Sequence, residues 1–468
     1  MENIGNITPE FLTSVVFPDR KGKQLNYLMV IPHKAVNKYA FPVGLGIVTA
    51  SLKASGRSVF CVNLDMYGEP LEKLKEEILS QRIDVMMVGG FSVEYHAIRS
   101  ILRAARQAKP DLVTVVGGGI VTADPVPAMI ALEEADYGMI GEGEITVNAL
   151  SYAIEHGGDA SRLPGVICRK DGEWVANTDF PETEDLDSIP YPDYEGFEYG
   201  RILYGDKYAN KWTKRSGSNR ILYLNITRSC PYLCTFCFHT CGNHFRSMSM
   251  DGIFRFLDWM LERYPGIEAL SIDGELTLHN ERFSLEFCRR LAPYHLKWRA
   301  NTRADIVTEI MLRAMRECGC TSVMFGIESA CNSILKNMKK RLTVEQIERA
   351  FEAADRAGIY ARGTLIFGDP EETLDTLRTT LRWYLSHRKW SDIDCFWNIT
   401  LGLIKAYPGT ALYWDACSRG LIKDKVQFLK DGCPPINMSK LSDEVYDSLP
   451  ALFQELYKED AEKTLSWI

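Results

Sequence analysis

The chain has 468 residues and a formal net charge of -8, with 46% hydrophobic and 25% charged residues. These ordinary globular values exclude disordered and fibrous classes, and the acidic balance leaves no broad basic field for gripping an extended nucleic acid. The first residues lack a basic segment followed by an apolar one, and no run of about 18 apolar residues predicts a membrane span, so we expect a cytoplasmic protein.

The first 160 residues alternate short apolar strands with amphipathic helices. Strands are predicted over 27–32, 58–65, 84–90, 112–118 and 137–143, with helical patterns over 69–81 and 95–108. Crossovers of this length predict a parallel, doubly wound, Rossmann-like α/β sheet, which binds ligands at the carboxyl ends of its strands. Those ends are rich in glycine. We assign residues 1–160 to this first domain.

A predicted hairpin and an acidic, proline-rich linker follow, and we assign residues 161–218 to these two segments. A second strand–helix series has strands predicted over 221–227, 268–274, 296–303, 321–329, 360–368 and 394–404. Six consecutive units favour a partial (β/α)6, TIM-like barrel over 219–405 rather than another open sheet. Residues 406–468 are predicted to form a small helical extension.

Three cysteines crowd a loop directly after the first strand of the second series. Cys230, Cys234 and Cys237 form a C-x3-C-x2-C motif. A structural zinc site normally takes four ligands from two paired knuckles, and no second C-x2-C pair occurs in the chain. Packed cysteines have no reason to gather in one loop. Compact thiolate loops are typical of iron-sulfur clusters, and three ligands for four irons leave one iron open.

The cysteine motif, with Phe236 just before its last cysteine, resembles that of the radical S-adenosylmethionine superfamily. The resemblance implies a 4Fe-4S cluster whose open iron chelates S-adenosylmethionine, and a 5'-deoxyadenosyl radical that abstracts hydrogen from a substrate. Cys241 as a fourth ligand would close the cluster and abolish this chemistry. Because the family pattern stops at Cys237, we expect Cys241 and His239 to line the pocket or to pack.

Later strand ends carry further motifs of this family. The segment "SIDGELTLHN" lies where the family often has Gly-Gly-Glu for the amino group of S-adenosylmethionine, with Asp273 in place of the first glycine. Arg303 would pair with the carboxylate, "FGIES" would meet the ribose or amino group, and "LIFGDPEET" resembles the adenine segment. Such residues also serve as turn formers and helix caps, but they recur at strand after strand. The expected S-adenosylmethionine contacts are Phe236, Asp273, Gly274, Glu275, Arg303, Glu328, Ser329, Ile366 and Gly368.

The glycine-rich ends of the first domain contain no G-x-G-x-x-G fingerprint in "VVGGGIVTADP", which argues against a dinucleotide. Together with "FPVGLG", "VGGFS" and "DYGMIGEGE", this segment resembles the cobalamin-binding domain that precedes the barrel in one class of the superfamily. Glycines there would let backbone approach the flat corrin ring. The implied cobalamin contacts are Gly89, Gly90, Ser92, Gly117, Gly118, Gly119, Thr122, Gly141, Glu142 and Gly143.

The chain departs from the cobalamin domains that supply a lower axial ligand. Those domains carry D-x-H-x-x-G after the first strand, whereas here His33 stands without the spaced aspartate and glycine. We therefore expect any bound cobalamin to have no protein imidazole below its cobalt. The alternative is a domain that keeps the fold and has lost the cofactor.

The resemblance implies an enzyme that methylates an unactivated carbon of a small-molecule or peptide substrate, with methylcobalamin as the methyl donor and a second S-adenosylmethionine to remethylate it. The alternatives are a radical lyase, cyclase or rearrangement enzyme, and an electron-transfer or cluster-sensing protein. We expect an external electron donor such as flavodoxin or ferredoxin. The loop after Cys237, the tip around His279, the tail beyond Thr410, and the aromatic residues Trp397 and Tyr407 are candidates for the substrate pocket.

Overall fold

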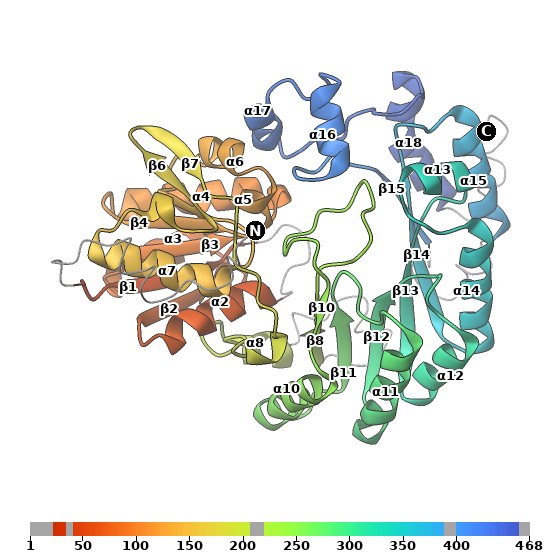
Figure 1. Ribbon diagram of the computed structural model, residues 1–468, viewed down its shortest axis with the longest axis horizontal. Coiled ribbons are helices and arrows are strands. Elements are labelled where there is room, and N and C mark those ends of the chain that lie inside the picture. The colour runs from red at the N-terminus through yellow and green to blue at the C-terminus, as the bar shows by residue number, and fades with distance from the viewer. Residues whose placement is uncertain (1–21, 34–40, 206–219, 388–398, 458–468) are drawn as a thin grey trace.

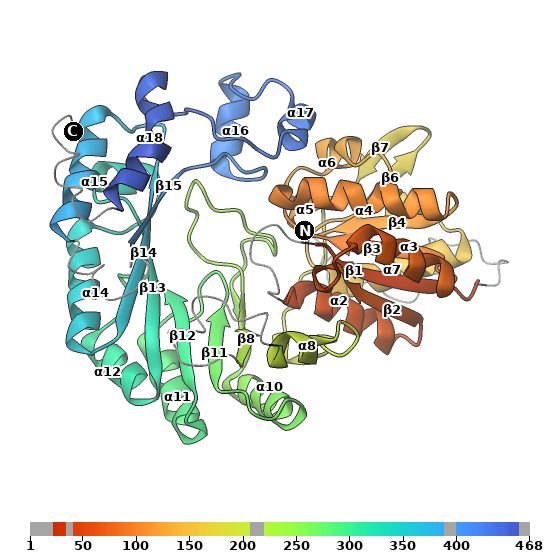
Figure 2. The ribbon, with the colours of Figure 1, turned by 180° about the vertical axis from the view of Figure 1, so that it is seen from behind.

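The computed structural model describes residues 22–33, 41–205, 220–387 and 399–457. Two lobes, each built on a largely parallel sheet, face each other across the middle of the molecule (Figures 1 and 2). The first sheet has the strand order β2-β1-β3-β4-β5-β6-β7 and the second has the order β15-β14-β13-β12-β11-β8. The predicted fold class, a doubly wound domain followed by a partial barrel, is confirmed.

The first lobe is wound on both faces of its sheet. Its strands are β1 (Asn26–Ile31), β2 (Ser58–Asn63), β3 (Val85–Gly89), β4 (Val113–Gly117), β5 (Tyr137–Met139), β6 (Val166–Lys170) and β7 (Glu173–Ala176). Its helices are α2 (Val43–Ala54), α3 (Pro70–Ser80), α4 (Tyr95–Ala108), α5 (Gly119–Ala123), α6 (Pro125–Ala131) and α7 (Gly143–His156). In β1, Tyr27 and Met29 pack with α2 and α7, whereas Leu28 and Val30 pack with α3 and α4. Burial on both faces explains why β1 is a continuous apolar run.

The hairpin that we placed after the first domain belongs to the first sheet. β6 pairs antiparallel with β5, and β7 pairs antiparallel with β6. The hairpin thereby covers the edge of β5, which would otherwise present unpaired backbone groups. The first lobe consequently extends to Ala176, beyond the predicted boundary at residue 160.

The second lobe is an open barrel of parallel strands. Its strands are β8 (Ile221–Asn225), β11 (Ala269–Asp273), β12 (Lys297–Thr302), β13 (Cys320–Glu328), β14 (Tyr360–Phe367) and β15 (Ile399–Leu403). Its helices are α10 (Met250–Arg263), α11 (Glu281–Leu291), α12 (Glu309–Glu317), α13 (Asn332–Asn337), α14 (Val344–Arg356) and α15 (Leu374–Ser386). β8 and β15 are the two edges in the described part of the chain, so the barrel is partial, as predicted. Residues 394–398 of the last predicted strand, and Trp397 with them, lie outside the described residues.

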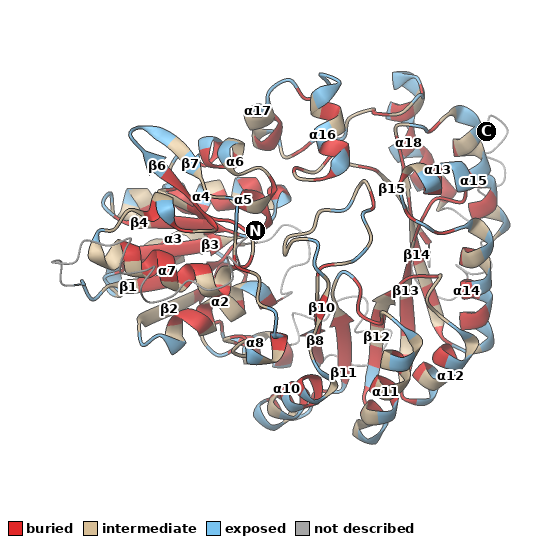
Figure 3. Ribbon diagram, viewed as in Figure 1, coloured by how far each residue is buried: buried red, intermediate tan, exposed pale blue. Residues whose placement is uncertain are grey.

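The strands of both sheets are largely buried, and the outer faces of the helices are exposed (Figure 3). Polar side chains begin several barrel helices by accepting a backbone N–H of the first turn, among them Ser249, Asn280, Thr308, Thr343 and Thr373. Among the described residues, we find no helix that combines the length and the hydropathy of a membrane span.

The linker and the C-terminal extension join the two lobes. The linker carries α8 (Tyr199–Tyr204), and the extension carries α16 (Ala411–Ser418), α17 (Lys425–Lys430) and α18 (Asp443–Leu456). The ring of Phe453 on α18 lies 5.0 Å from that of Phe367 on β14. The Tyr413 hydroxyl donates to Asp124 of the first lobe at 2.9 Å, and Lys425 Nζ lies 3.1 Å from the same carboxylate. The extension therefore bridges the lobes (Figure 1), which its sequence does not indicate.

Candidate active site

The three cysteines lie on one loop, residues 229–245, which we call the cysteine loop. A short antiparallel pair, β9 (Thr227–Arg228) and β10 (Arg246–Ser247), closes its base. Ser229 adopts a left-handed backbone with φ of 64°, and its hydroxyl donates to the carbonyl of Gly242 across the loop. The short base explains how a segment after a strand turns back on itself and holds its three cysteines within one closed loop.

The thiols lie beside buried positive charge. A hydrogen bond from the thiol of Cys237, together with the cations of Lys340 and Arg303, lowers the pKa of Cys234 to about 6 despite burial. The same hydrogen bond raises the pKa of Cys237, which is exposed, and burial raises that of Cys230. An iron-sulfur cluster needs thiolates, and nearby cations stabilise them. The donor set and its surroundings therefore fit such a cluster.

Lys340 is a site residue that the sequence analysis missed. Its ammonium lies 2.8 Å from Glu328 Oε1 and 5.6 Å from the ring centroid of Phe236, and both charged side chains are buried. Glu328 ends β13 with a left-handed φ of 62°. Two residues predicted to contact S-adenosylmethionine thus meet around one lysine. The run "KNMKKR" offers no signal for this role, because it looks like a solvated helix end.

Arg303 is bound within the protein. Its Nε and Nη2 atoms each lie 2.9 Å from a carboxylate oxygen of Asp305, and Nη2 donates to the carbonyl of Lys340 at 2.7 Å. The guanidinium carbon lies 3.6 Å from the ring centroid of Tyr232 in the cysteine loop. Arg303 therefore holds the Lys340 segment and the cysteine loop together. Its predicted contact with the carboxylate of S-adenosylmethionine stays a prediction.

The end of β11 carries the predicted Asp273, Gly274 and Glu275 segment. A Cβ on Gly274 would come within 2.8 Å of Thr227 Oγ1, so the glycine lets this end approach the base of the cysteine loop. Glu275 Oε2 lies 2.6 Å from Nδ1 of His239, and that hydrogen bond raises the pKa of His239. Burial raises the pKa of Asp273. The end of β11 and the cysteine loop are therefore joined by direct contacts, at Gly274 and at Glu275.

Three other predicted contacts have structural partners in the barrel wall. The Ser329 hydroxyl lies 3.2 Å from that of Thr380, and Ile366 packs against buried apolar side chains. Gly368 has a φ of 105°, and its N–H donates to buried Glu372 at 2.5 Å. These three residues do not line the cavity described next.

A cavity of about 910 Å³ lies between the lobes. The carboxyl ends of β3, β4 and β5 form one wall, and the Asp273, Gly274 and Glu275 segment belongs to the opposite wall. The linker contributes apolar side chains such as Ile189 and Tyr191, and Arg299 and Arg362 line the barrel interior. Both sheets thus open onto one space at the ends where such sheets bind ligands.

Most predicted cobalamin contacts line this cavity. They are Gly89, Gly90, Gly117, Gly118, Gly119, Gly141, Glu142 and Gly143, and we call the seven glycines the glycine edge. Ser92 and Thr122 lie outside the lining; Thr122 supports the edge by accepting the N–H of Gly141 at 2.9 Å. The carboxylate of Glu142 forms ion pairs with Arg228 and Arg246 of the barrel lobe.

A Cβ atom placed on each glycine shows which glycines the protein packing requires and which leave space in the cavity wall. A Cβ on Gly118 would lie 2.9 Å from the carbonyl oxygen of Gly90, and a Cβ on Gly141 would lie 2.2 Å from the ring of Phe180. Protein packing therefore already requires glycine at positions 118 and 141. On Gly117 a Cβ would meet nothing nearer than Met139 at 3.5 Å. The bare backbone at Gly117 leaves space that belongs to the cavity, which fits a flat ring lying against the edge.

His33 follows β1, and its Nδ1 lies 3.4 Å from Oδ1 of Asp65 at the end of β2. It is not among the residues that line the cavity. The expectation of no imidazole below cobalt therefore stays a prediction. Cys241 does line the cavity, and burial, followed by the nearby charge of Glu142, raises its pKa to about 11.

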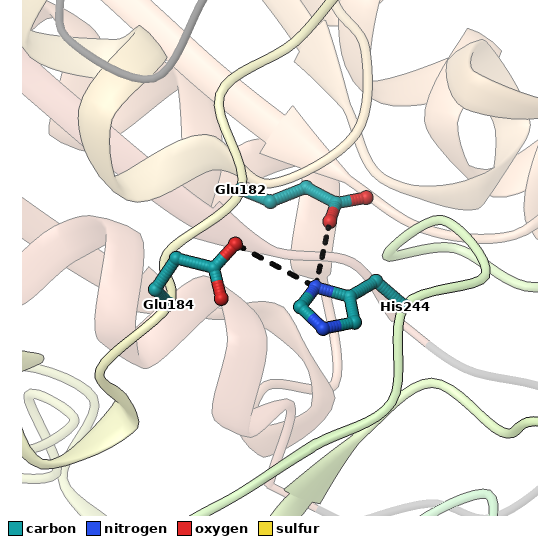
Figure 4. A group of neighbouring side chains, drawn as sticks. All are labelled: Glu182, Glu184 and His244. Atoms are coloured by element: carbon teal, nitrogen blue, oxygen red, sulfur yellow. Dashed lines mark ion pairs between the residues drawn. The ribbon is translucent and has the colours of Figure 1, made fainter. Parts of the chain in front are cut away.

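A second group of potential metal ligands joins the first part of the linker to the cysteine loop. Glu182 and Glu184 each place a carboxylate oxygen 3.6 Å from Nδ1 of His244 (Figure 4). The side chains of Glu184 and His244 are more than half exposed to solvent, so the group has the character of a solvated ion pair.

Comparison with known families supports both halves of the site. A family model for the radical SAM superfamily matches residues 224–384, and one for the B12 binding domain matches residues 34–151. An uncharacterized methyltransferase of Pyrococcus horikoshii is 28% identical over 327 residues, which are 69% of this chain and 67% of that protein. An anaerobic magnesium-protoporphyrin IX monomethyl ester cyclase of Rubrivivax gelatinosus is 27% identical over 76% of this chain and 63% of its own. The chain thus spans about two thirds of the length of these relatives.

Solved structures share the two-lobed fold. The radical S-adenosylmethionine methyltransferase TsrM of Kitasatospora setae aligns with a TM-score of 0.67 over 84% of this chain and 76% of its own, at 17% identity. The cobalamin-dependent S-adenosylmethionine radical enzyme OxsB aligns with a TM-score of 0.64 over 90% of this chain and 58% of its own, at 19% identity. The cysteine loop, the glycine edge and the two family matches agree. The cofactors are a 4Fe-4S cluster, S-adenosylmethionine and cobalamin. The chain therefore belongs to the radical S-adenosylmethionine superfamily, as an enzyme of the class in which a cobalamin-binding domain precedes the barrel.

Proposed function

We propose that this enzyme methylates an unactivated carbon of a small-molecule or peptide substrate. The observation that carries the proposal is the shared cavity of about 910 Å³, because the glycine edge and the Asp273, Gly274 and Glu275 segment face the same space. A radical formed at one wall and a methyl donor held at the other would both reach a substrate between them. The methyltransferase of Pyrococcus horikoshii and TsrM support the proposal by their names.

When bound, the cluster with S-adenosylmethionine supplies a hydrogen-abstracting radical, and cobalamin supplies the methyl group. The chain supplies position and exclusion of water. Cys230, Cys234 and Cys237 would hold the cluster, with Lys340 and Arg303 providing positive charge beside it. The apolar linker wall and the barrel interior would keep water away from the reacting carbon.

The cluster needs an electron from outside, and we propose a flavodoxin- or ferredoxin-like donor. Leu233, between the first two cysteines, is 58% exposed, so the cysteine loop reaches the surface. A donor that docks there would meet the loop at Leu233, which is not among the residues that line the cavity.

The test uses anaerobically reconstituted, reduced enzyme with hydroxocobalamin and S-adenosylmethionine labelled with deuterium in its methyl group. We expect 5'-deoxyadenosine, S-adenosylhomocysteine and a labelled methyl group on the product when candidate substrates are screened by mass spectrometry. Absence of 5'-deoxyadenosine with every substrate would argue for an electron-transfer protein instead.

A radical cyclase or lyase is the second candidate, because three of the similar relatives are anaerobic magnesium-protoporphyrin IX monomethyl ester cyclases. That reaction would yield 5'-deoxyadenosine without S-adenosylhomocysteine or label in the product. The same assay therefore separates the two candidates.

A further inference from the structure

Four charged side chains are buried where the lobes meet beside the cavity. Glu142 and Glu144 begin α7 of the first lobe, and Arg228 and Arg246 belong to β9 and β10 of the barrel lobe. Arg228 Nη1 lies 2.5 Å from Glu142 Oε2 and also contacts Glu144, and Arg246 contacts the other oxygen of Glu142. The exposed fractions of these side chains run from 1% for Glu142 to 14% for Arg228. Two positive and two negative charges therefore balance within one cluster.

The two arginines stand at the base of the cysteine loop. Arg228 and Arg246 are directly opposite partners in the antiparallel pair that closes the loop. Arg246 also donates to the carbonyl of Cys241 inside the loop at 3.1 Å. Any shift of Glu142 relative to the barrel lobe would consequently be transmitted to both ends of the loop that carries the three predicted cluster ligands.

The linker is part of the same network. The Thr183 N–H donates to Glu142 Oε2 at 3.0 Å, and its hydroxyl donates to Glu144 Oε1 at 2.9 Å. Its carbonyl accepts a hydrogen bond from Arg246 Nη1 at 2.9 Å. Three segments far apart in the sequence thus meet at Glu142, which lies between Gly141 and Gly143 of the glycine edge.

Buried ion clusters add little net stability compared with apolar packing, but removing one partner leaves an uncompensated buried charge, so each charge depends on the position of the others. We propose that Glu142 is a positioning residue, which holds the cysteine loop at a set place against the glycine edge so that the cluster and the corrin face one another. This inference rests on the proposed function, since it concerns the alignment of the two cofactors. The contact to the barrel lobe comes in addition to the predicted cobalamin contact of Glu142, which stays a prediction.

The test is Glu142→Gln in the full-length protein reconstituted with cluster and hydroxocobalamin. The matched control is Glu155→Gln, which breaks a similarly buried pair with Arg57 inside the first lobe, where Nε lies 2.7 Å from Oε1. Hydrogen exchange of residues 228–247 is the first readout. We expect exchange to rise about tenfold or more in Glu142→Gln and to stay within about twofold in Glu155→Gln.

The second readout needs no substrate. With titanium(III) citrate as reductant, cobalt(I) should attack the labelled methyl group of S-adenosylmethionine and release S-adenosylhomocysteine, and the labelled corrin is measured after extraction. We expect a drop of about tenfold or more in Glu142→Gln, with iron and retained corrin within about twofold of wild type. Methyl transfer to the corrin in Glu142→Asp, which keeps the charge, should lie between that of the wild type and that of Glu142→Gln.

Unchanged exchange of residues 228–247 in Glu142→Gln would overturn the proposal, as would equal losses of iron, corrin and methyl transfer in Glu142→Gln and Glu155→Gln. Wild-type protein that leaves the corrin unlabelled would count against the proposed function, while the exchange measurement would still decide the positioning role. If Glu142→Gln does not fold, Glu144→Gln provides the exchange test, because it removes one partner of Arg228 and leaves Arg246 bound to Glu142.

Discussion

The two sheets present their ligand edges to the cavity in different ways. On the barrel side, Glu275 lines the cavity and pairs with His239, and a second pair, Glu328 with Lys340, lies outside the cavity lining. On the side of the first lobe, glycines leave bare backbone. A charged edge suits an anionic cluster and a sulfonium compound that carries an ammonium and a carboxylate group, whereas a bare edge suits a large flat ring held by shape. Changes on one edge should therefore affect one cofactor and spare the other.

The largest effect is expected when the barrel side loses its thiols. A triple alanine variant of Cys230, Cys234 and Cys237 should retain no cluster iron, because alanine offers no ligand. Its corrin retention should stay within about twofold of wild type, since the glycine edge is untouched. Iron analysis and visible absorbance after anaerobic reconstitution measure both. The control Cys417→Ala, on α16, should keep its iron, and unchanged iron in the triple variant would refute the cluster assignment.

Filling the glycine edge should produce the opposite pattern. Gly117→Leu would project a side chain into the cavity, so corrin retained after desalting should fall about tenfold or more while iron stays unchanged. Gly117→Ala should give a smaller loss. Gly68→Leu is the control, because a Cβ there meets nothing within 4 Å and Gly68 lies outside the cavity lining. Full corrin retention in Gly117→Leu would mean that the ring does not lie against this edge.

Removing the buried lysine tests the charge on the barrel side. Lys340→Met leaves Glu328 buried without its partner, which should lower the free energy of unfolding by about 3–5 kcal/mol. Loss of a nearby cation should also make the cluster harder to reduce. The double variant with Glu328→Gln should recover part of the stability, and the exposed neighbour change Lys339→Met should have little effect. Denaturant unfolding and redox titration measure the two consequences, and equal results for Lys339→Met and Lys340→Met would contradict this account.

The smallest effect concerns Glu372 beneath Gly368. Burial raises the pKa of Glu372 from 4.5 to about 7. Because the folded protein holds this proton more tightly than the unfolded chain, the stabilisation is complete below pH 4.5 and is lost as the pH rises to about 7. Glu372→Gln should remove that slope and raise stability near pH 8 by about 1–3 kcal/mol relative to wild type.

Urea unfolding of the apoprotein at about pH 5 and about pH 8 measures this change. Glu371→Gln, at a half-exposed neighbour paired with Lys440, is the control and should keep the wild-type slope. A Glu372→Gln variant with the wild-type pH slope would show that the buried carboxyl does not titrate in this range.

The sequence was sufficient for the strands and for the cysteine motif. Apolar runs such as 27–32 and 112–118 became β1 and β4 within one or two residues, because strands buried on both faces must be continuously apolar. The sequence was insufficient where partners lie far apart. It did not indicate that the hairpin of β6 and β7 extends the first sheet, or that Lys340 lies beside the cysteine loop.

By itself, the sequence determined the strand–helix alternation, the three clustered thiols and the glycines at the strand ends, since each depends on neighbouring residues. Only the tertiary structure decided that both ligand edges open onto one cavity and which charges are paired across it. Glu142 and Arg228 are 86 residues apart, and their contact exists only because the lobes pack against each other. Local patterns record backbone and burial preferences, whereas the pairing of distant charges depends on how the folded surfaces fit.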